Sequence, residues 1–229
     1  MFISLWDTIC FDRKVLKPYS LLGRCIKMYD KVLIKISNFV LLDTNTHLHY
    51  VIDELGLPEK KGGFLYVGAN TEIFHPLQVE KSNKFRVFWC GNVLPLQGVE
   101  IILKAAKLLG DNNNIEFFLV GPVRKKYCDL IKRLSLSNVI FKDRVSYKDL
   151  SSEICKSHLC LGGHFGIVPK SGRVIAGKTF QFLSCGIPTV VGDCGANREI
   201  FEDEDKLIRF VKMGDEYALT DLINKYYVK

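Results

Sequence analysis

An α/β fold, with a parallel sheet covered by helices on both faces, is the fold class that the sequence predicts. From residue 85 onward, short apolar runs of strand length alternate with segments whose apolar residues recur at helical spacing. Such alternation with apolar strands is typical of a parallel sheet that is buried on both faces. A glycine-rich stretch, Gly162–Gly166, directly follows one of these strands. Loops at the carboxyl ends of strands are where α/β sheets bind ligands.

The expected elements rest on apolar spacing and on residues that begin or end helices. Ser20 and Thr44 have the side chains of N-caps and precede expected helices at 21–37 and 45–55. Strands are expected at 39–43 and 64–67. Residues 1–18 have no clear pattern, and Asp12–Lys14 with Pro18–Ser20 indicates a loop or a short extended piece there. The later strands are expected at 86–91, 115–121, 139–143, 159–161, 189–192 and 207–211. The later helices are expected at 98–109, 124–134, 147–156, 174–185 and 215–227.

Helix 21–37 combines an apolar face with a row of basic residues. The apolar face consists of Leu22, Ile26, Tyr29, Leu33 and Ile36, and the basic row consists of Lys27, Lys31 and Lys35. We favour a solvated surface for the basic row, since charge runs on helices are usually solvated. Contact with anionic lipid is the alternative.

Composition narrows the classes of function. With 229 residues, the chain has room for one large domain or one and a half domains, and its net charge of +7 favours anionic ligands or an anionic membrane surface. Nucleic acid is not an expected partner, because no recognition motif accompanies the scattered lysines. The eight cysteines have no metal-site spacing, so free thiols in the cytoplasm are expected. The first residues do not resemble a signal peptide, and no apolar run is long enough to span a bilayer.

Three stretches carry a resemblance to a known family. Ser184–Val191 reads SCGIPTVV and is followed by Gly195 and Glu199, Gly91–Glu100 reads GNVLPLQGVE, and Gly68–Pro76 reads GANTEIFHP. In this order and spacing they resemble the signatures of retaining glycosyltransferases of the GT-B fold, family 4 or group 1. The resemblance covers roughly residues 30–229.

The resemblance implies a domain organisation. GT-B enzymes have two Rossmann-like domains with the active site between them. Residues 85–229 would be the C-terminal domain that binds the nucleotide sugar, residues 78–84 the hinge, and residues 1–77 a partial, acceptor-side N-terminal domain. Because most of the acceptor-binding half is then missing, we expect a separate N-terminal half or self-association. Exposed apolar residues are expected along Leu22, Ile26 and Leu33.

The donor-binding residues are also those that the resemblance implies. The first loop, with Gly91 and Gly98, has Asn92 and Gln97 where the family has Arg and Lys, so the charge must come from elsewhere. Lys178 and Arg173, and to a lesser degree Lys170, are the candidates for binding the diphosphate. Gln181 stands where the family has the Glu that binds the ribose, and Arg173 stands at the first Glu of that pair.

Four further residues complete the expected donor site. Asn197 and Glu199 lie where the family contacts the sugar or its phosphate through backbone N–H groups at a helix start. Val145 matches a position whose backbone reads the base. His164 follows two glycines at a strand end, and ligand contact or a structural role are equally open for it. No metal ligands have a suitable spacing, so a metal site is not expected, and no residue is assigned a catalytic role.

The resulting function is the transfer of a sugar from a nucleotide-diphosphate sugar to a glycan or lipid acceptor, without a metal or another cofactor. A degenerate, non-catalytic module that binds nucleotide or a partner protein is one alternative, and a GT-B nucleotide-sugar epimerase is another. The expected location is the cytoplasm, with peripheral contact at the inner face of the membrane left open. The sequence does not identify the sugar, the base or the acceptor.

Overall fold

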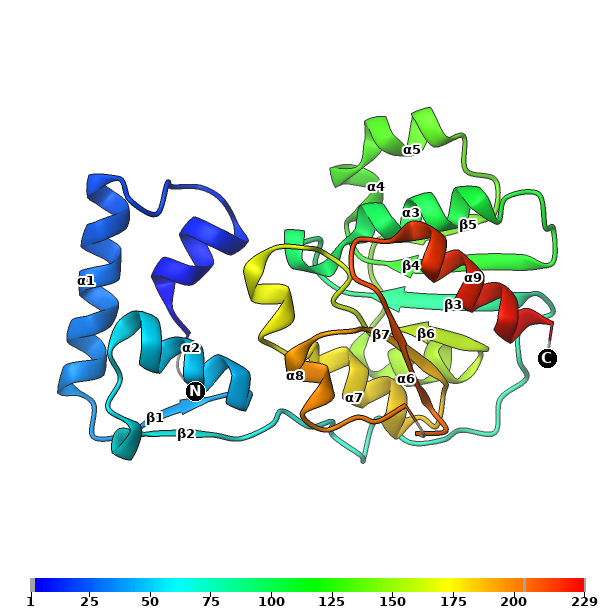
Figure 1. Cartoon of the computed structure of the whole chain (residues 1–229). Helices are drawn as coiled ribbons and strands as arrows, with labels where there is room; N and C mark the ends of the chain where they lie inside the picture. Colours follow the sequence, from blue (N-terminus) through cyan, green and yellow to red (C-terminus); the bar gives the residue numbers. More distant parts are fainter. Residues whose placement is uncertain (1–2, 204, 229) are drawn as a thin grey trace.

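Six parallel strands form the larger of two sheets (Figure 1). The structure is a computed structural model, and it describes residues 3–203 and 205–228. The strand order is β5-β4-β3-β6-β7-β8, and every neighbouring pair is parallel. The strands are β3 (Phe85–Cys90), β4 (Ile115–Val120), β5 (Val139–Lys142), β6 (Leu159–Leu161), β7 (Thr189–Gly192) and β8 (Ile208–Val211). This confirms the expected α/β fold and its strands. The order changes direction between β3 and β6, which is the switch point where such sheets bind ligands.

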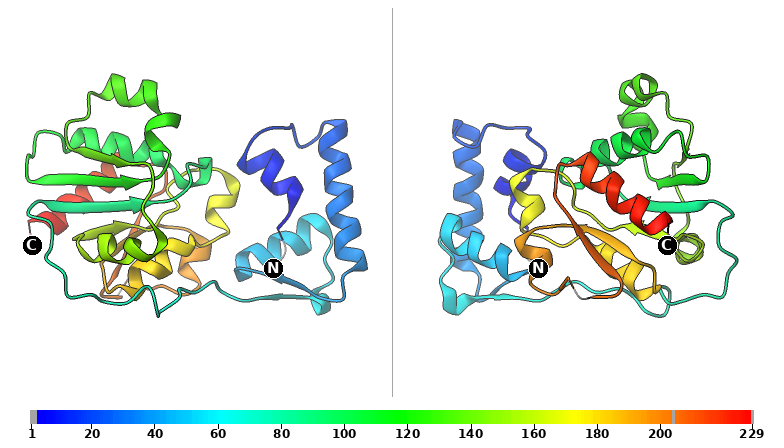
Figure 2. Two further views of the ribbon diagram at one scale, coloured as in Figure 1. Left: turned by 180° about the vertical axis from the view of Figure 1, so that it is seen from behind. Right: turned by 45° about the vertical axis from the view of Figure 1, so that its right-hand side comes forward.

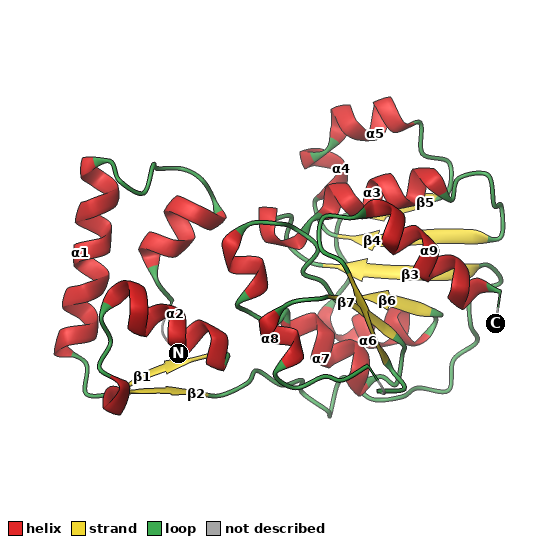
Figure 3. Cartoon of the chain, in the orientation of Figure 1, coloured by secondary structure: helices red, strands yellow, loops and turns green. Residues whose placement is uncertain are grey.

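Helices cover both faces of this sheet (Figures 2 and 3). Alternate residues of β3 point to opposite faces, as the pleat requires: Val87 belongs to one buried cluster and Phe88 to another. The first cluster includes residues of α3 (Val99–Leu108) and α9 (Glu216–Tyr227). The second includes residues of α6 (Tyr147–Cys155) and α7 (Gly177–Ser184). Two such layers on one parallel sheet make the three-layer arrangement that the sequence predicts.

Two predicted helices differ from those observed. The helix expected at 124–134 is divided into α4 (Val123–Lys126) and α5 (Cys128–Leu134). Tyr127 lies at the break, where its backbone leaves the helical region and its hydroxyl donates to Glu100 Oε2 over 2.8 Å. The helix expected from residue 174 begins at Gly177, because residues 174–176 run through buried positions as extended or irregular backbone after the turn η4 (Pro169–Gly172). The short elements η3 (Pro95–Gln97) and α8 (Gly195–Arg198) complete this part.

Residues 3–64, which we call the N-terminal unit, have a separate two-stranded parallel sheet. It pairs β1 (Val40–Leu42) with β2 (Gly62–Phe64), so the strand expected at 64–67 lies earlier in the chain. The helices are η1 (Asp7–Asp12), α1 (Leu21–Ile36), α2 (Asn45–Leu55) and the turn η2 (Glu59–Lys61). The sequence did not predict η1, whereas residues 13–20, where a loop or extended piece was indicated, have no helix or strand. Both predicted N-caps are confirmed, since the Ser20 and Thr44 hydroxyls accept from the backbone N–H groups of Gly23 and His47.

Helix α1 turns much of its apolar face to solvent. Its buried positions are Gly23, Asp30 and Ile34. The Asp30 carboxylate accepts hydrogen bonds from Ser4 Oγ at 2.7 Å and from the Trp6 backbone N–H at 2.9 Å. Six apolar residues of the helix are exposed, namely Leu21, Leu22, Met28, Tyr29, Val32 and Ile36. Of the three residues expected to be exposed, Leu22 is, whereas Ile26 packs partly against the core of the N-terminal unit and Leu33 is half-buried.

Residues 65–84 connect β2 to β3 without a helix or strand. The expected hinge at 78–84 lies within this segment and stays a prediction. Within the described residues, 3–203 and 205–228, no helix is long and apolar enough to cross a membrane.

Candidate functional site

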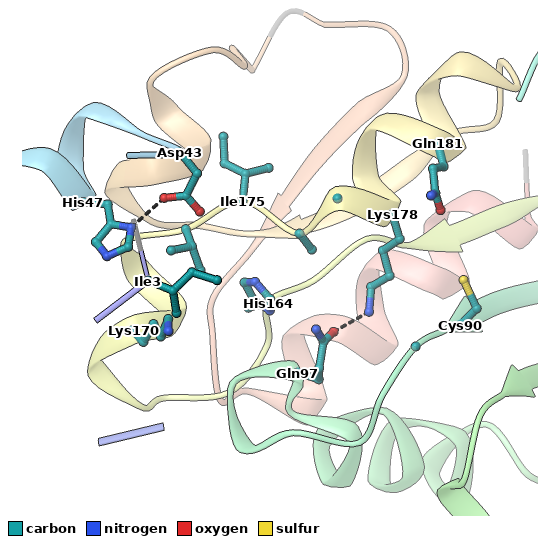
Figure 4. Close-up of a pocket in the computed structure, with 14 residues that line it drawn as sticks. Ile3, Asp43, His47, Cys90, Gln97, His164, Lys170, Ile175, Lys178 and Gln181 are labelled. Carbon is teal, nitrogen blue, oxygen red and sulfur yellow. Dashed lines mark hydrogen bonds and ion pairs between the residues drawn. The ribbon is translucent and has the colours of Figure 1, made fainter. Parts of the chain in front are cut away.

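A cavity of about 440 Å³ lies at the switch point of the six-stranded sheet, and we call it the switch-point cavity (Figure 4). It is bordered by the ends of β3 and β6 and by the start of α7, and the N-terminal unit closes its other side. Gly98 allows the loop after β3 to meet the loop after β6. Its φ is +62°, and a Cβ there would lie 2.4 Å from the Gly166 nitrogen, so only glycine permits this approach.

Lys178 is the buried cation of the switch-point cavity. It sits in the first turn of α7, with a side chain 8% exposed, its Nζ donating to Gln97 Oε1 and lying 4.5 Å from the centre of the Trp89 ring. No salt bridge joins it to a carboxylate in the described part of the chain. Burial lowers its pKa from the ordinary 10.5 to about 7. An anionic ligand would supply the negative charge that this buried ammonium group has no protein partner to provide.

His164 borders the same cavity from the loop after β6. Its imidazole is 3% exposed, and Nδ1 has no hydrogen-bond partner among the described residues. Burial, with Lys178 and Lys170 nearby, lowers its pKa to about 3, so the ring is neutral at physiological pH. Ligand contact, which the sequence left open, is therefore consistent with its position.

The predicted donor residues divide into those that meet at the cavity and those that do not. Gly91, Gln97, His164, Lys170, Lys178 and Gln181 border it. Asn92 is exposed and outside it, and Gly98 shapes the loop beneath it. Val145 borders a different hollow, together with Arg86 and Lys156.

The structure contradicts a donor role for Arg173. Its guanidinium donates to the buried carboxylate of Asp7 at 2.6 Å and lies 3.6 Å from the centre of the Tyr50 ring. Arg173 does not border the cavity. It joins the six-stranded domain to the N-terminal unit, because a buried carboxylate needs a cationic partner.

Lys170 contacts both the cavity and the N-terminal unit. It borders the cavity, donates to Thr8 Oγ1 at 3.1 Å and lies 3.7 Å from Asp7 Oδ2. Part of its charge is therefore already offset by the N-terminal unit.

Glu199 also serves the contact between the two parts of the chain. Its carboxylate accepts from the backbone N–H groups of Asn45 at 2.8 Å and Thr46 at 2.6 Å, which are the first amides of α2. It also accepts from the hydroxyl groups of Thr46 and Tyr66. A carboxylate at a helix N-terminus satisfies free amides and favours the helix dipole. The side chain is therefore not available to a sugar, whereas the contact that the resemblance implies through backbone N–H groups stays a prediction. We call this set of bonds the Glu199 clasp.

Asn197 does not reach the cavity either. Its side chain is 1% exposed, and its amide nitrogen donates to the Gly192 carbonyl at 2.7 Å. The side chain therefore holds the loop after β7 in place, and the donor contact that the resemblance implies for the backbone of this loop stays a prediction.

Sequence reasoning missed the residues that the N-terminal unit contributes to the cavity. Asp43 and His47 border it, together with Ile3. The four-residue spacing of Asp43 and His47 across a helix start was the available signal, but His164 and Lys178 on the facing wall lie more than a hundred residues away in the chain. Within the described residues, no group of His, Cys, Asp and Glu is arranged to hold a metal ion.

The strand order and the cavity at its switch point define a Rossmann-like ligand-binding domain of the GT-B type, and comparisons identify the family. Residues 84–228 match the family described as glycosyl transferases group 1. The chain therefore belongs to the glycosyl transferases group 1. A chitobiosyldiphosphodolichol beta-mannosyltransferase of Candida albicans is 23% identical in an alignment of 202 residues that covers 79% of this chain and 43% of that protein.

Solved structures show the same fold at low sequence identity. HepE of Anabaena in complex with UDP-glucose has a TM-score of 0.74 and 18% identity, covering 89% of this chain and 58% of that one. The glycosyltransferase WaaG, involved in lipopolysaccharide biosynthesis, has a TM-score of 0.72 and 15% identity, covering 93% and 60%. The chain spans about half the length of the relatives that it matches.

Proposed function

We propose that the switch-point cavity binds a nucleotide-diphosphate sugar and that the chain is the donor-binding part of a retaining glycosyltransferase. The observation that carries this proposal is Lys178, a buried ammonium group without a carboxylate partner in a cavity at the switch point. Burying a charge without a partner is costly, so the site is suited to a ligand that brings the opposite charge. Membership of the family and the UDP-glucose complex of HepE support the same donor class.

The residues around Lys178 fit different parts of such a donor. Lys178 would bind the diphosphate, and Lys170 is the second cation at the cavity wall. Gln181 lies one helical turn beyond Lys178 and has an amide oxygen that can accept from a ribose hydroxyl. Neutral His164 would donate or accept a hydrogen bond without adding charge. The diphosphate leaving group would be stabilised by these fixed groups instead of a metal ion or another cofactor.

The acceptor we propose is a glycan or a lipid-linked sugar. The name of the Candida relative places that protein among enzymes acting on a lipid diphosphate-linked saccharide. The exposed apolar residues of α1, with Lys31 and Lys35 exposed beside them, would suit peripheral contact with a membrane. Lys27 is not part of this basic surface, since it donates to Glu54 at 2.9 Å and lies over the Trp6 ring.

A further acceptor-side segment is part of the proposal. The sheet of the N-terminal unit has two strands in the described residues, and Phe39, Phe64 and Leu65 are exposed near it. An additional Rossmann-like segment, on the same longer polypeptide or on a separate chain, would extend this sheet and cover part of α1.

A degenerate nucleotide-binding module is the second candidate, and two observations favour it. Arg173 and Glu199, both expected at the donor, are committed to contacts with the N-terminal unit. Gln97 and Gln181 supply amides where the resembled family has charged groups. Incubation with a nucleotide sugar, with the acceptor-side segment present, separates the candidates: a transferred sugar supports the enzyme, an unchanged one the module, and an altered one an epimerase.

Lys178→Ala tests the binding site directly, with Lys104→Ala as the control. Lys104 is on α3 and pairs with Glu216 at 3.2 Å, outside the cavity. Loss of a charged hydrogen bond should weaken binding of UDP or GDP by roughly 1.5–3 kcal/mol in the first variant alone, as measured by calorimetry. Equal affinities of the two variants would remove Lys178 from the site.

The wild-type affinity should also fall as the pH rises above about 7, because the ammonium group with a pKa of about 7 then loses its proton. A pH-independent affinity between 6 and 9 in wild type would contradict the role of Lys178.

A further inference from the structure

The switch-point cavity has two chemically different walls (Figure 4). The six-stranded domain contributes the cation Lys178 and the amide Gln97, whereas the N-terminal unit contributes Asp43 and His47. The two walls therefore suit different parts of one ligand: a cation attracts phosphate, and a carboxylate repels it.

Asp43 and His47 form a pair with one open hydrogen-bonding position. Asp43 directly follows β1, and His47 is in the first turn of α2, four residues later. His47 Nδ1 lies 2.5 Å from Asp43 Oδ1, and the histidine is 4% exposed. Its Nε2 is buried without a hydrogen-bond partner among the described residues. Such a buried group costs free energy unless a ligand or water satisfies it.

The pair is held against the six-stranded domain by contacts on both sides of it. Thr44 donates its hydroxyl to the Arg173 carbonyl at 2.5 Å. The Glu199 clasp binds the next two amides of the chain, at Asn45 and Thr46. The start of α2 is thus fixed relative to the donor loops, although α2 belongs to the N-terminal unit, which has a separate sheet.

We propose that His47, oriented by Asp43, binds a ligand hydroxyl and completes the switch-point cavity from the N-terminal unit. The Asp43 carboxylate accepts the proton of Nδ1, so Nε2 presents a lone pair that can accept from a hydroxyl group. The negative charge of Asp43 disfavours phosphate on this side. A sugar hydroxyl is the matching ligand, from either the transferred sugar or the acceptor. The inference rests on the proposed donor function and adds the group that recognises the sugar.

His47→Asn is the test variant, because the asparagine amide lies where the ring has Nδ1 and can still donate to Asp43, whereas nothing replaces Nε2. His49→Asn is the matched control: His49 is on the same helix, is exposed and does not border the cavity. Affinities are measured by calorimetry for UDP, for UDP-glucose, and for n-octyl glucoside with UDP present. GDP and GDP-mannose replace the uridine probes if wild type prefers guanosine.

Loss of one hydrogen bond should weaken binding of one sugar probe roughly 3- to 10-fold in His47→Asn, with the nucleotide affinity unchanged and the control like wild type. Loss confined to the nucleotide sugar identifies the donor hydroxyl, and loss confined to the glucoside identifies the acceptor hydroxyl. Unchanged affinity for both sugar probes, or an equal loss for UDP itself, overturns the role of His47. If wild type binds no nucleotide at all, the proposed function fails and this inference fails with it.

Discussion

Lys178→Met should stabilise the protein while weakening its ligand site. Methionine has a similar length and keeps apolar contacts, but it removes the ammonium group that is buried beside Trp89 and Gln97. The wild-type pKa of about 7, against the ordinary 10.5, corresponds to a penalty for the charged form on the order of 5 kcal/mol at 1.36 kcal/mol per pH unit. We expect the variant to be more stable than wild type at pH 7.

The pH dependence of stability gives this expectation a definite sign. Because the folded-state pKa of Lys178 is lowered, the unfolded chain binds more protons between pH 7 and 10.5, and wild type becomes more stable as the pH rises through this window. The penalty is fully present below pH 7 and has disappeared above 10.5. Between pH 7 and 9, wild type should gain about 2 kcal/mol relative to Lys178→Met.

Urea unfolding of both proteins at pH 7, 8 and 9 measures this difference. Other titrating groups, such as the buried cysteine thiols, are common to both proteins and largely cancel in the comparison. Parallel stability curves, or a variant less stable than wild type at pH 7, would show that Lys178 is not an uncompensated buried charge. The reasoning that makes it the phosphate-binding group would then be refuted.

Two further predictions concern the metal and the acceptor side. Nucleotide binding should be insensitive to EDTA, because no group of side chains within residues 3–203 and 205–228 is arranged to bind a metal ion. A loss of affinity that magnesium or manganese restores would contradict metal-independent binding. The purified 229-residue chain should bind nucleotide without releasing UDP or GDP from nucleotide sugars, because the two-stranded sheet β1-β2 is too small for a complete acceptor-binding domain. The assay measures released UDP or GDP with and without cell extract as a source of acceptor. Robust turnover by a monomer would show that this chain is sufficient for the reaction.

The fold could be predicted where local sequence determines local structure. The strands β3 to β8 are short apolar runs, and parallel strands buried on both faces need such runs. The Ser20 and Thr44 caps were predictable because each hydroxyl binds an amide three residues away. The start of α7 was not, since residues 174–176 have apolar side chains that suit a helix. Val174 and Ile175 instead belong to two different buried clusters, the second of which includes residues of β7 and β8.

The candidate site was only partly predictable, because the position of each charged side chain depends on residues that are far away in the sequence. Lys178 was placed correctly from its helix and the glycine loops before it. Arg173 has the same charge and a similar position, but Asp7, 166 residues away in the chain, binds it. Glu199 likewise meets α2 over a separation of more than 150 residues. Motif spacing contains no information on which of several charged residues will meet such a partner.

The Glu199 clasp couples the stability of the first turn of α2 to the closure of the switch-point cavity by the N-terminal unit. If the N-terminal unit moves away from the six-stranded domain, the Asn45 and Thr46 amides lose their acceptor, and Thr44 loses the Arg173 carbonyl. The first turn of α2, which contains His47, would then be less stable, because the Asn45 and Thr46 amides would have water as their main partner. The Thr44 cap on the His47 amide lies within the N-terminal unit and would remain, so closure around a bound ligand would strengthen a turn that is already formed.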